Sequence, residues 1–223
     1  MLSTEDGRFL KMIVINFKNY KFGKETVELA KKIEKYLPSA IACPSALDAG
    51  DVSCSTKLKV YAQHVDNFDG DRATGFVLAG GLKKLGVRGS LLNHSEHRIP
   101  EKEIAETIAK CNSLGLKIIL CAESVAEARR FISLKPEAIA FEDRDLIGSG
   151  KSITDYKSDE VKKFVGVLRG SGVKALCGAG VSSAEDVRVA FELGCDGVLI
   201  ASAIVKGDLE KAEKLLREIS RVR

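Results

Sequence analysis

The sequence predicts a protein of the α/β class, a single compact (β/α)8 barrel formed by one domain. Short apolar runs rich in β-forming residues recur eight times, and most are followed by an amphipathic segment. These runs are continuously apolar rather than alternating, which is typical of parallel strands covered on both faces. No Pro-rich or Ser-rich linker divides the 223 residues, and such barrels typically have about 250 residues.

The eight runs give the predicted strands in chain order. They are MIVINF (12–17), SAIACP (39–44), LKVYAQ (58–63), GSLLNH (89–94), LKIILC (116–121), EAIAFE (137–142), VKALCG (173–178) and DGVLIA (196–201). The helical periodicity between them predicts helices over 24–37, 101–115, 124–134, 158–172, 182–194 and 208–222.

Local signals mark the ends of several predicted helices. Pro100 precedes one segment and a Gly closes it, as is usual for helix ends. Ser124 is a suitable N-cap, and Ser182 stands three residues before Glu185, which is the spacing of a capping box. The unit between the second and third strands is the weakest, with only a helical turn expected near 47–52.

An open doubly wound sheet is the alternative architecture. Such a sheet needs a glycine-rich fingerprint directly after its first strand. The residues that follow the first predicted strand are KNYKFG, which contain no G-x-G-x-x-G pattern. The closed barrel is therefore favoured.

The composition excludes several classes of partner and site. The formal net charge is +4, and Lys and Arg are scattered among nearly as many Asp and Glu, so we expect no nucleic-acid partner. No apolar run approaches the roughly 18 residues of a membrane span, so we expect no membrane partner. The six cysteines have no C-x-x-C pair and no metal-ligand spacing to the histidines, which indicates reduced core residues, a cytoplasmic location and no bound metal.

The first eleven residues, MLSTEDGRFLK, are polar and lack the apolar core of a signal peptide. We expect residues 1–11 to be a disordered leader or the product of a mis-assigned start. The barrel domain is then expected to cover 12–223.

The carboxyl ends of all the strands of such a barrel meet at one face, where active sites form. One amine, one imidazole and one carboxylate are expected there: Lys18, His94 and Glu142. Two turns of small residues, 178–180 and 201–203, follow the last two strands. Their backbone N–H groups can bind an anion such as a phosphate.

Each of these residues also has a simpler interpretation. Glu142 could be a solvated carboxylate at a strand exit, or a base made stronger by partial burial at the rim. His94 alone is more often a structural histidine, and Lys18 alone a surface lysine. His64 is interpreted as structural or interfacial. A short helical start after His94 would direct N–H groups at one ring nitrogen and disfavour the imidazolium.

Taken together, the motifs NFK (16–18), NHSEHR (93–98), CGAGVSS (177–183) and DGVLIASAIV (196–205) resemble the triosephosphate isomerase family in its short archaeal-type form. The resemblance runs from about Met12 to the C-terminus and implies a TIM barrel that isomerises a triose phosphate without cofactor or metal. It also implies a homodimer or homotetramer, because DNFDGDRATG matches the segment through which the family docks its subunits.

The resemblance also implies roles for individual residues. Glu142 is the base, His94 the electrophile at the carbonyl oxygen, and Lys18 the cation beside the enediolate. Asn16 orients Lys18, and Glu96 supports it. The implied phosphate contacts are Ile147, Gly148, Gly180, Ala201 and Ser202.

Two departures from the family pattern stand out. Asp143 follows the base where the family usually has Pro, so the first hinge of the active-site lid is expected to be looser. The eighth strand ends in Ala201 and Ser202 rather than in a glycine pair, which narrows the expected phosphate pocket slightly.

Two alternatives to the isomerase remain open from the residues alone. One is another phosphate-binding barrel enzyme of small-molecule biosynthesis, and the other is a non-catalytic phosphate-binding barrel. A Schiff-base aldolase would need a buried Lys in the sixth strand, where this chain has EAIAFE. A barrel that had lost its chemistry would be expected to lack Lys18, His94 or Glu142.

Overall fold

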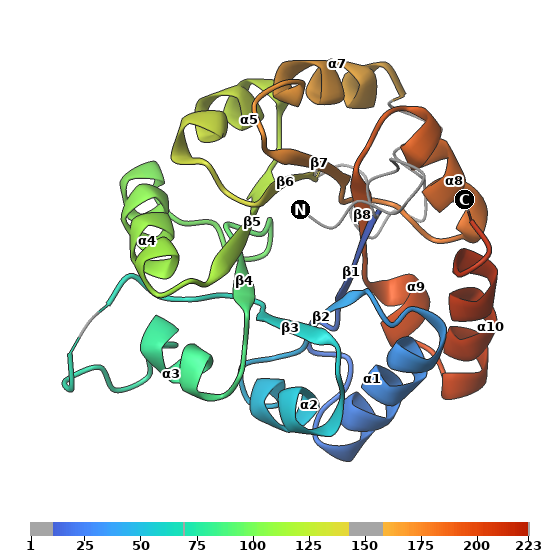
Figure 1. The fold of residues 1–223 in the computed structure, drawn as a ribbon, viewed down its shortest axis with the longest axis horizontal. Coiled ribbons are helices and arrows are strands. Elements are labelled where there is room, and N and C mark those ends of the chain that lie inside the picture. Colours follow the sequence, from blue (N-terminus) through green and yellow to red (C-terminus); the bar gives the residue numbers. More distant parts are fainter. Residues whose placement is uncertain (1–10, 69, 143–157, 223) are drawn as a thin grey trace.

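The computed structural model describes residues 11–68, 70–142 and 158–222. Eight parallel strands pair in chain order and close into a barrel, with the helices arranged around it (Figure 1). The strands are β1 (Met12–Asn16), β2 (Ile41–Cys43), β3 (Lys59–Ala62), β4 (Gly89–Leu92), β5 (Lys117–Ala122), β6 (Ala138–Phe141), β7 (Lys174–Cys177) and β8 (Gly197–Ile200). The predicted (β/α)8 barrel is confirmed, and every strand ends within two residues of its predicted bounds.

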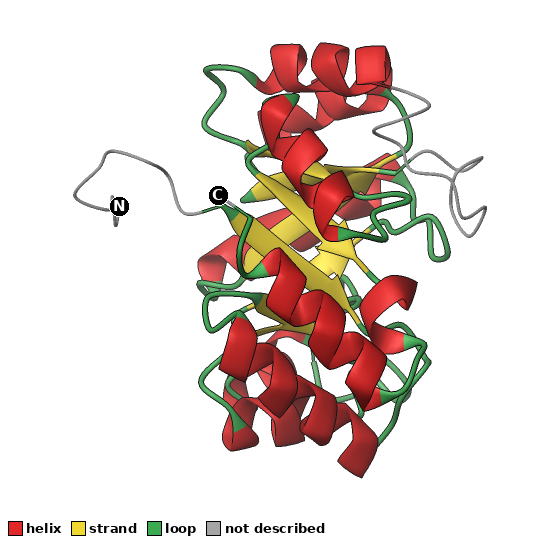
Figure 2. Cartoon of the chain, turned by 90° about the vertical axis from the view of Figure 1, so that its right-hand side faces the viewer, coloured by secondary structure: helices red, strands yellow, loops and turns green. Residues whose placement is uncertain are grey.

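The helices pack against the outside of the strands (Figure 2). They are α1 (Lys24–Tyr36), α2 (Ala49–Ser55), α3 (Ala79–Lys84), α4 (Glu101–Ser113), α5 (Val125–Phe131), α7 (Ser158–Leu168), α8 (Ala184–Glu192), α9 (Ser202–Val205) and α10 (Leu209–Ile219). No helix in the described ranges is both long enough and apolar enough to cross a membrane.

The helices differ from expectation in several places. Between β2 and β3, where only a helical turn was expected, the chain forms a seven-residue helix, α2. The short helices α3 and α9 were not predicted. The segment predicted as one helix from 124 to 134 divides into α5 and a 3-10 turn, Ile132–Leu134, which Lys135 ends with a φ of 52°.

The predicted capping box on Ser182 and Glu185 is wrong by one residue. The helix α8 begins at Ala184, so the N-cap is Ser183, whose hydroxyl accepts the Asp186 N–H at 3.1 Å. The Asp186 carboxylate accepts the Ser183 N–H at 2.9 Å in return. Asp186 thus takes the place in the capping box that the prediction gave to Glu185.

The buried apolar residues form two layers because successive side chains of a strand point to opposite faces. The inner layer fills the barrel with Val14, Ile41, Cys43, Tyr61, Leu91, Ile119, Cys121, Ala138, Ala140, Leu176 and Leu199. The alternate strand residues pack outward against the helices. Burial of both faces explains why the strands are continuously apolar in sequence. All six cysteines are free thiols and five are buried, as expected of small core residues.

The inner layer depends on a glycine where one strand faces a large side chain of its neighbour. Tyr61 lies inside the barrel, and its hydroxyl donates to Glu137 at 2.6 Å. A Cβ atom on Gly89 would lie 2.7 Å from the Tyr61 ring and 2.2 Å from the Lys117 carbonyl oxygen. Only glycine fits at this position in β4.

The first and last long helices are held together around one carboxylate. Glu213 of α10 pairs with Lys32 at 2.5 Å and Lys35 at 3.3 Å on α1, and it also accepts a hydrogen bond from the Tyr36 hydroxyl. These contacts, with Lys32 first, lower the pKa of Glu213 to about 2. The cluster joins the two ends of the ring of helices.

Candidate active site

Strand alternation carries several polar side chains to the mouth of the barrel. Val14 and Ala140 belong to the inner layer, so the residues two positions later, Asn16 and Glu142, continue on the inward face. Asn16 is 3% exposed and Glu142 is 2% exposed. Both lie at the carboxyl ends of their strands, the face on which the sequence predicted the site.

The carboxylate and the imidazole of the predicted set are in direct contact. The Nε2 atom of His94 lies 3.2 Å from Oε1 of Glu142. The backbone N–H of Ser95 donates to the other oxygen of Glu142 at 3.3 Å. One short turn therefore contacts both carboxylate oxygens of Glu142.

The same turn assigns the tautomer of His94. The backbone N–H of Glu96 donates to Nδ1 at 3.1 Å, so Nδ1 must be the unprotonated nitrogen. The proton of a neutral imidazole then resides on Nε2, which faces Glu142. The predicted helical start after His94 is wrong, because residues 95–97 form a tight turn, but that turn provides the expected N–H.

Lys18 is held at the mouth through its backbone and through its side chain. Its φ is 45°, and the Asn16 side chain accepts its N–H at 2.9 Å. Gln63 donates to the Lys18 carbonyl oxygen at 2.8 Å, a contact that the sequence did not reveal. The Nζ atom lies 2.7 Å from Oε1 of Glu96. Asn16 and Glu96 thus contact the lysine as the resemblance implied.

These contacts form one continuous path across the mouth. Lys18 meets Glu96, the second oxygen of Glu96 lies 3.8 Å from Nδ1 of His94, and His94 meets Glu142. The structure therefore brings together the three side chains that the sequence placed at three separate strand ends. A proton acceptor, a neutral hydrogen-bond donor and a cation can act here on one small molecule.

A cavity of about 470 Å³ opens beside this path. Its lining consists of Asn16, Lys18, Asn19, Tyr20, Gln63, His64, His94, Glu96 and His97. His64 and His97 stack in its wall with ring centroids 4.1 Å apart. Burial, followed by the neighbouring His97, lowers the pKa of His64. His64 lies 3.3 Å from Asp66 through Nε2 and is not a member of the path.

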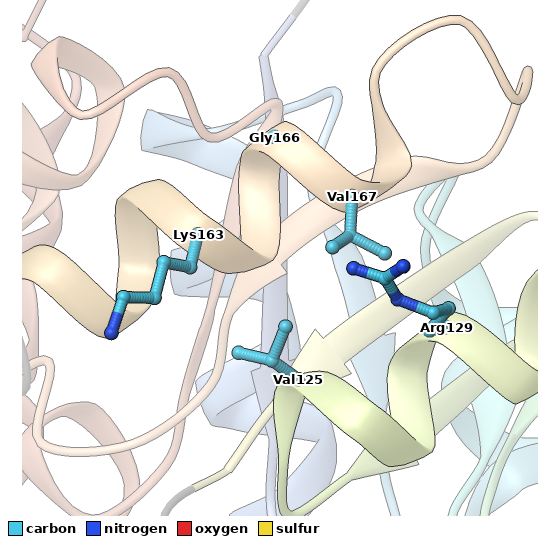
Figure 3. A pocket seen from close by; sticks show the side chains of 5 residues that line it. All are labelled: Val125, Arg129, Lys163, Gly166 and Val167. Carbon is cyan, nitrogen blue, oxygen red and sulfur yellow. The ribbon is translucent and has the colours of Figure 1, made fainter.

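A larger cavity of about 530 Å³ lies on the outer wall, between α5 and α7 (Figure 3). It is lined by Val125 and Arg129 of α5 and by Lys163, Gly166 and Val167 of α7. Lys163 is paired with Glu160 at 2.7 Å. This lining holds no imidazole and no carboxylate, so the mouth of the barrel, not the larger cavity, has the chemistry.

The predicted phosphate contacts are described only in part. Gly180 follows β7 with a φ of 66°, and Ala201 follows β8 and caps α9, which begins at Ser202. The first N–H groups of a helix have no partner within it, which leaves them available to an anion. Ile147, Gly148 and Asp143 lie outside the described residues, as does the predicted lid. Within the described ranges, no three His, Cys, Asp or Glu residues are grouped as metal ligands.

Gly178 directly follows β7, and its position against Glu142 is a relation that the sequence did not reveal. A Cβ atom there would lie 2.9 Å from Cγ of Glu142 and 3.0 Å from the Phe141 carbonyl oxygen. The sequence showed only a glycine in a turn after a strand. Its closeness to Glu142 depends on the adjacent strand, β6, and is visible only in three dimensions.

Comparison with known proteins decides the family. A family model described as triosephosphate isomerase matches residues 11–218. The chain belongs to the triosephosphate isomerase family. It is 38% identical over 197 residues to triosephosphate isomerase of Thermoplasma volcanium, which covers 87% of this chain and 92% of the relative. It is 37% identical over 216 residues to the Methanocaldococcus jannaschii protein of that name, covering 93% and 98%.

A third member of the family, from Methanothermus fervidus, is 38% identical over 218 residues and covers 93% of this chain and 98% of its own. These relatives are archaeal and have nearly the same length as this chain. The predicted short archaeal-type form of triosephosphate isomerase is therefore confirmed. The fold and the family agree with the geometry at the mouth of the barrel.

Proposed function

We propose that this protein is a triose-phosphate isomerase, which interconverts glycerone phosphate and D-glyceraldehyde 3-phosphate. The observation that carries the proposal is the contact between Nε2 of His94 and Oε1 of Glu142, with Lys18 at the other end of the same path. The reaction moves one proton between adjacent carbons and one proton from the hydroxyl group to the carbonyl oxygen, with no net oxidation or reduction. It therefore needs no cofactor.

Glu142 is the proposed base. Its carboxylate removes a proton from the carbon next to the carbonyl group and returns it to the neighbouring carbon. The proton of the hydroxyl group moves to the former carbonyl oxygen, and the two transfers together convert the ketose into the aldose. The intermediate is an enediolate, with negative charge on oxygen. A separation of 3.2 Å between Glu142 and His94 leaves no room for substrate carbons, so the carboxylate has to swing away from the imidazole when substrate enters.

His94 and Lys18 are the proposed stabilisers of the enediolate. The Nε2–H group of a neutral imidazole donates to the substrate oxygen as charge develops on it. The ammonium group of Lys18, whose side chain is 16% exposed, adds a fixed positive charge beside that oxygen and the phosphate. Asn16 and Glu96 keep Lys18 in place.

The phosphate is proposed to bind opposite the base. Backbone N–H groups at Gly180, Ala201 and Ser202 support this assignment, because they lie at adjacent strand ends of the barrel. Ile147 and Gly148 are proposed to complete the contacts from the lid. A closed lid would exclude water from the enediolate.

We also propose that the protein works in glycolysis and gluconeogenesis in the cytoplasm and that it self-associates as a homodimer or homotetramer. The segment after β3 supports self-association. Phe68 and Phe76 stack there at 4.8 Å, and Phe76 remains 49% exposed. The Asp66 carboxylate joins the two ends of this segment by accepting the Val77 N–H at 2.6 Å. Sedimentation analysis would give the number of subunits.

A coupled assay with glyceraldehyde 3-phosphate tests the proposed function. Replacing Glu142 by Gln should lower kcat by about 10²-fold or more, because a positioned base is removed. Glu123→Gln, on the neighbouring strand exit, is the matched control. Activity that survives Glu142→Gln would refute the assigned base. A parent protein inactive on triose phosphates would favour another phosphate-binding barrel enzyme or a non-catalytic one.

A further inference from the structure

His94 points into the mouth of the barrel against the alternation of its own strand. In β4, Leu91 belongs to the inner layer and Leu92 to the outer layer. Continued alternation would direct Asn93 inward and His94 outward, towards the helices. Yet His94 contacts Glu142 at the mouth. Something between Leu92 and His94 reverses the alternation.

The reversal occurs at Asn93. Its φ is 60°, in the left-handed region, which is costly for residues other than glycine and least costly for Asn and Asp. Within the described ranges, the other residues besides glycine with positive φ are Lys18 and Lys135. One residue in this conformation turns the chain sharply, so the next side chain emerges on the other face.

The side chain of Asn93 holds this conformation from both sides. It is fully buried, its Nδ2 donates to the Cys121 carbonyl oxygen at 3.1 Å, and its Oδ1 accepts the Ile99 N–H at 3.1 Å. The first bond ties the turn to β5. The second closes the turn on itself.

Arg98 adds a third tie at the end of the same turn. One of its guanidinium nitrogens lies 3.5 Å from the Asn93 carbonyl oxygen, and another donates to Glu127 of α5. Glu127 is 6% exposed, and its second oxygen accepts the Glu123 N–H at 2.8 Å. The turn is thereby anchored to a helix as well as to a strand.

We infer that Asn93 is a positioning residue that aims His94 into the active site by holding the left-handed conformation that reverses the strand alternation. This inference rests on the proposed function for its kinetic consequences. Its structural part, the orientation of the His94 ring, does not depend on which reaction the site performs.

The decisive comparison is between two variants that both lose the side-chain hydrogen bonds. Asn93→Gly still allows positive φ without steric cost, so kcat should stay within about three-fold of the parent. Asn93→Ala disfavours positive φ, so kcat should fall by about ten-fold or more while KM changes little. Lys135→Ala, at another left-handed position far from the mouth, is the matched control and should retain the parent kcat.

The ring nitrogens of His94 provide a readout without substrate. In protein with ¹⁵N-labelled histidine, the parent should show Nδ1 unprotonated and Nε2 protonated, as the Glu96 N–H contact requires. Asn93→Ala should alter these signals, and Asn93→Gly should preserve them. This readout keeps its meaning even if the parent protein turns out not to isomerise triose phosphates.

A second pair of variants covers the case in which Asn93→Ala does not fold. The double variant Asn93→Gly with Arg98→Met also removes the contact between the Arg98 guanidinium and the carbonyl oxygen of residue 93. Its kcat should fall about ten-fold below that of Asn93→Gly. Arg130→Met, which removes an exposed pair with Glu101 at 2.6 Å, is the control for the arginine change. A folded Asn93→Ala, or the double variant, with the parent kcat and the parent ring signals would overturn the inference.

Discussion

The two groups that face each other across the mouth of the barrel, Nε2 of His94 and Oε1 of Glu142, are 3.2 Å apart. A single turn after β4 holds both, because the Glu96 N–H fixes the imidazole and the Ser95 N–H fixes the carboxylate. The relative position of the proposed base and the proposed electrophile is thus set by a few backbone groups. Changes to residues that support these groups should alter turnover more than they alter folding.

Lys18→Met should weaken both substrate binding and turnover, since it removes the cation that is proposed to face the phosphate and the enediolate. We expect kcat/KM for glyceraldehyde 3-phosphate to fall by about 10²-fold or more. Lys24→Met, at the exposed start of α1, changes the net charge equally and should have little effect. Equal values of kcat/KM for the two variants would contradict the assigned role of Lys18.

Gly178→Ala should displace the Glu142 carboxylate without unfolding the protein. The new Cβ atom would lie 2.9 Å from Cγ of Glu142, so we expect kcat to fall about ten-fold as the carboxylate shifts. Gly166→Ala, in α7 with nothing within 4 Å of its new Cβ atom, is the matched control. It should keep the parent kcat and gain about 0.5–1 kcal/mol of stability. An unchanged kcat in Gly178→Ala would show that the base tolerates the extra methyl group.

Gly89→Ala should destabilise the barrel itself. Its Cβ atom would meet the Tyr61 ring at 2.7 Å and a backbone oxygen at 2.2 Å, and neither can move freely inside the packed interior. We expect the free energy of unfolding in urea to fall by about 3 kcal/mol. Gly80→Ala in α3, with open space around its new Cβ atom, should leave it unchanged or raise it. A Gly89→Ala barrel as stable as the parent would mean that Tyr61 can repack.

Glu213→Gln should lower the melting temperature in a way that depends on pH. The contacts with Lys32, Tyr36 and Lys35 lower the pKa of Glu213 from 4.5 to about 2, so its carboxylate stabilises the folded state above the unfolded pKa. That contribution is lost as the pH falls through the folded value. The difference in melting temperature from the parent should be largest near neutral pH and should shrink towards pH 2–3. Glu218→Gln, exposed on the same helix, should show no such trend; a constant difference for Glu213→Gln would contradict the argument.

The sequence was sufficient for the architecture and for the set of chemical groups at the mouth. Continuous apolar runs separated by amphipathic segments predict eight covered strands, and the residue that ends each run follows directly. Lys18, His94 and Glu142 were predicted in this way, and the family resemblance added Asn16 and Glu96 as their supporting residues. The physical reason is that strand periodicity and helix amphipathicity are local properties of the chain.

What the sequence could not give depends on contacts between segments far apart in the chain. The function of Gly178 requires knowledge that β6 places Glu142 against it, and the role of Gln63 requires the position of the Lys18 carbonyl oxygen. The capping box uses Ser183 rather than Ser182 because α8 begins at Ala184, and packing decides where that helix begins.

The way in which His94 reaches the mouth is the sharpest example. The sequence by itself predicted His94 at the mouth because it follows the fourth strand, although simple alternation of that strand would direct its side chain away. Only the tertiary structure decided how that alternation is reversed, because the carbonyl oxygen of Cys121 on β5 and the N–H of Ile99 hold Asn93 in a left-handed conformation. Neighbouring segments fix this backbone dihedral, so the hydrophobic periodicity of the strand itself does not reveal it.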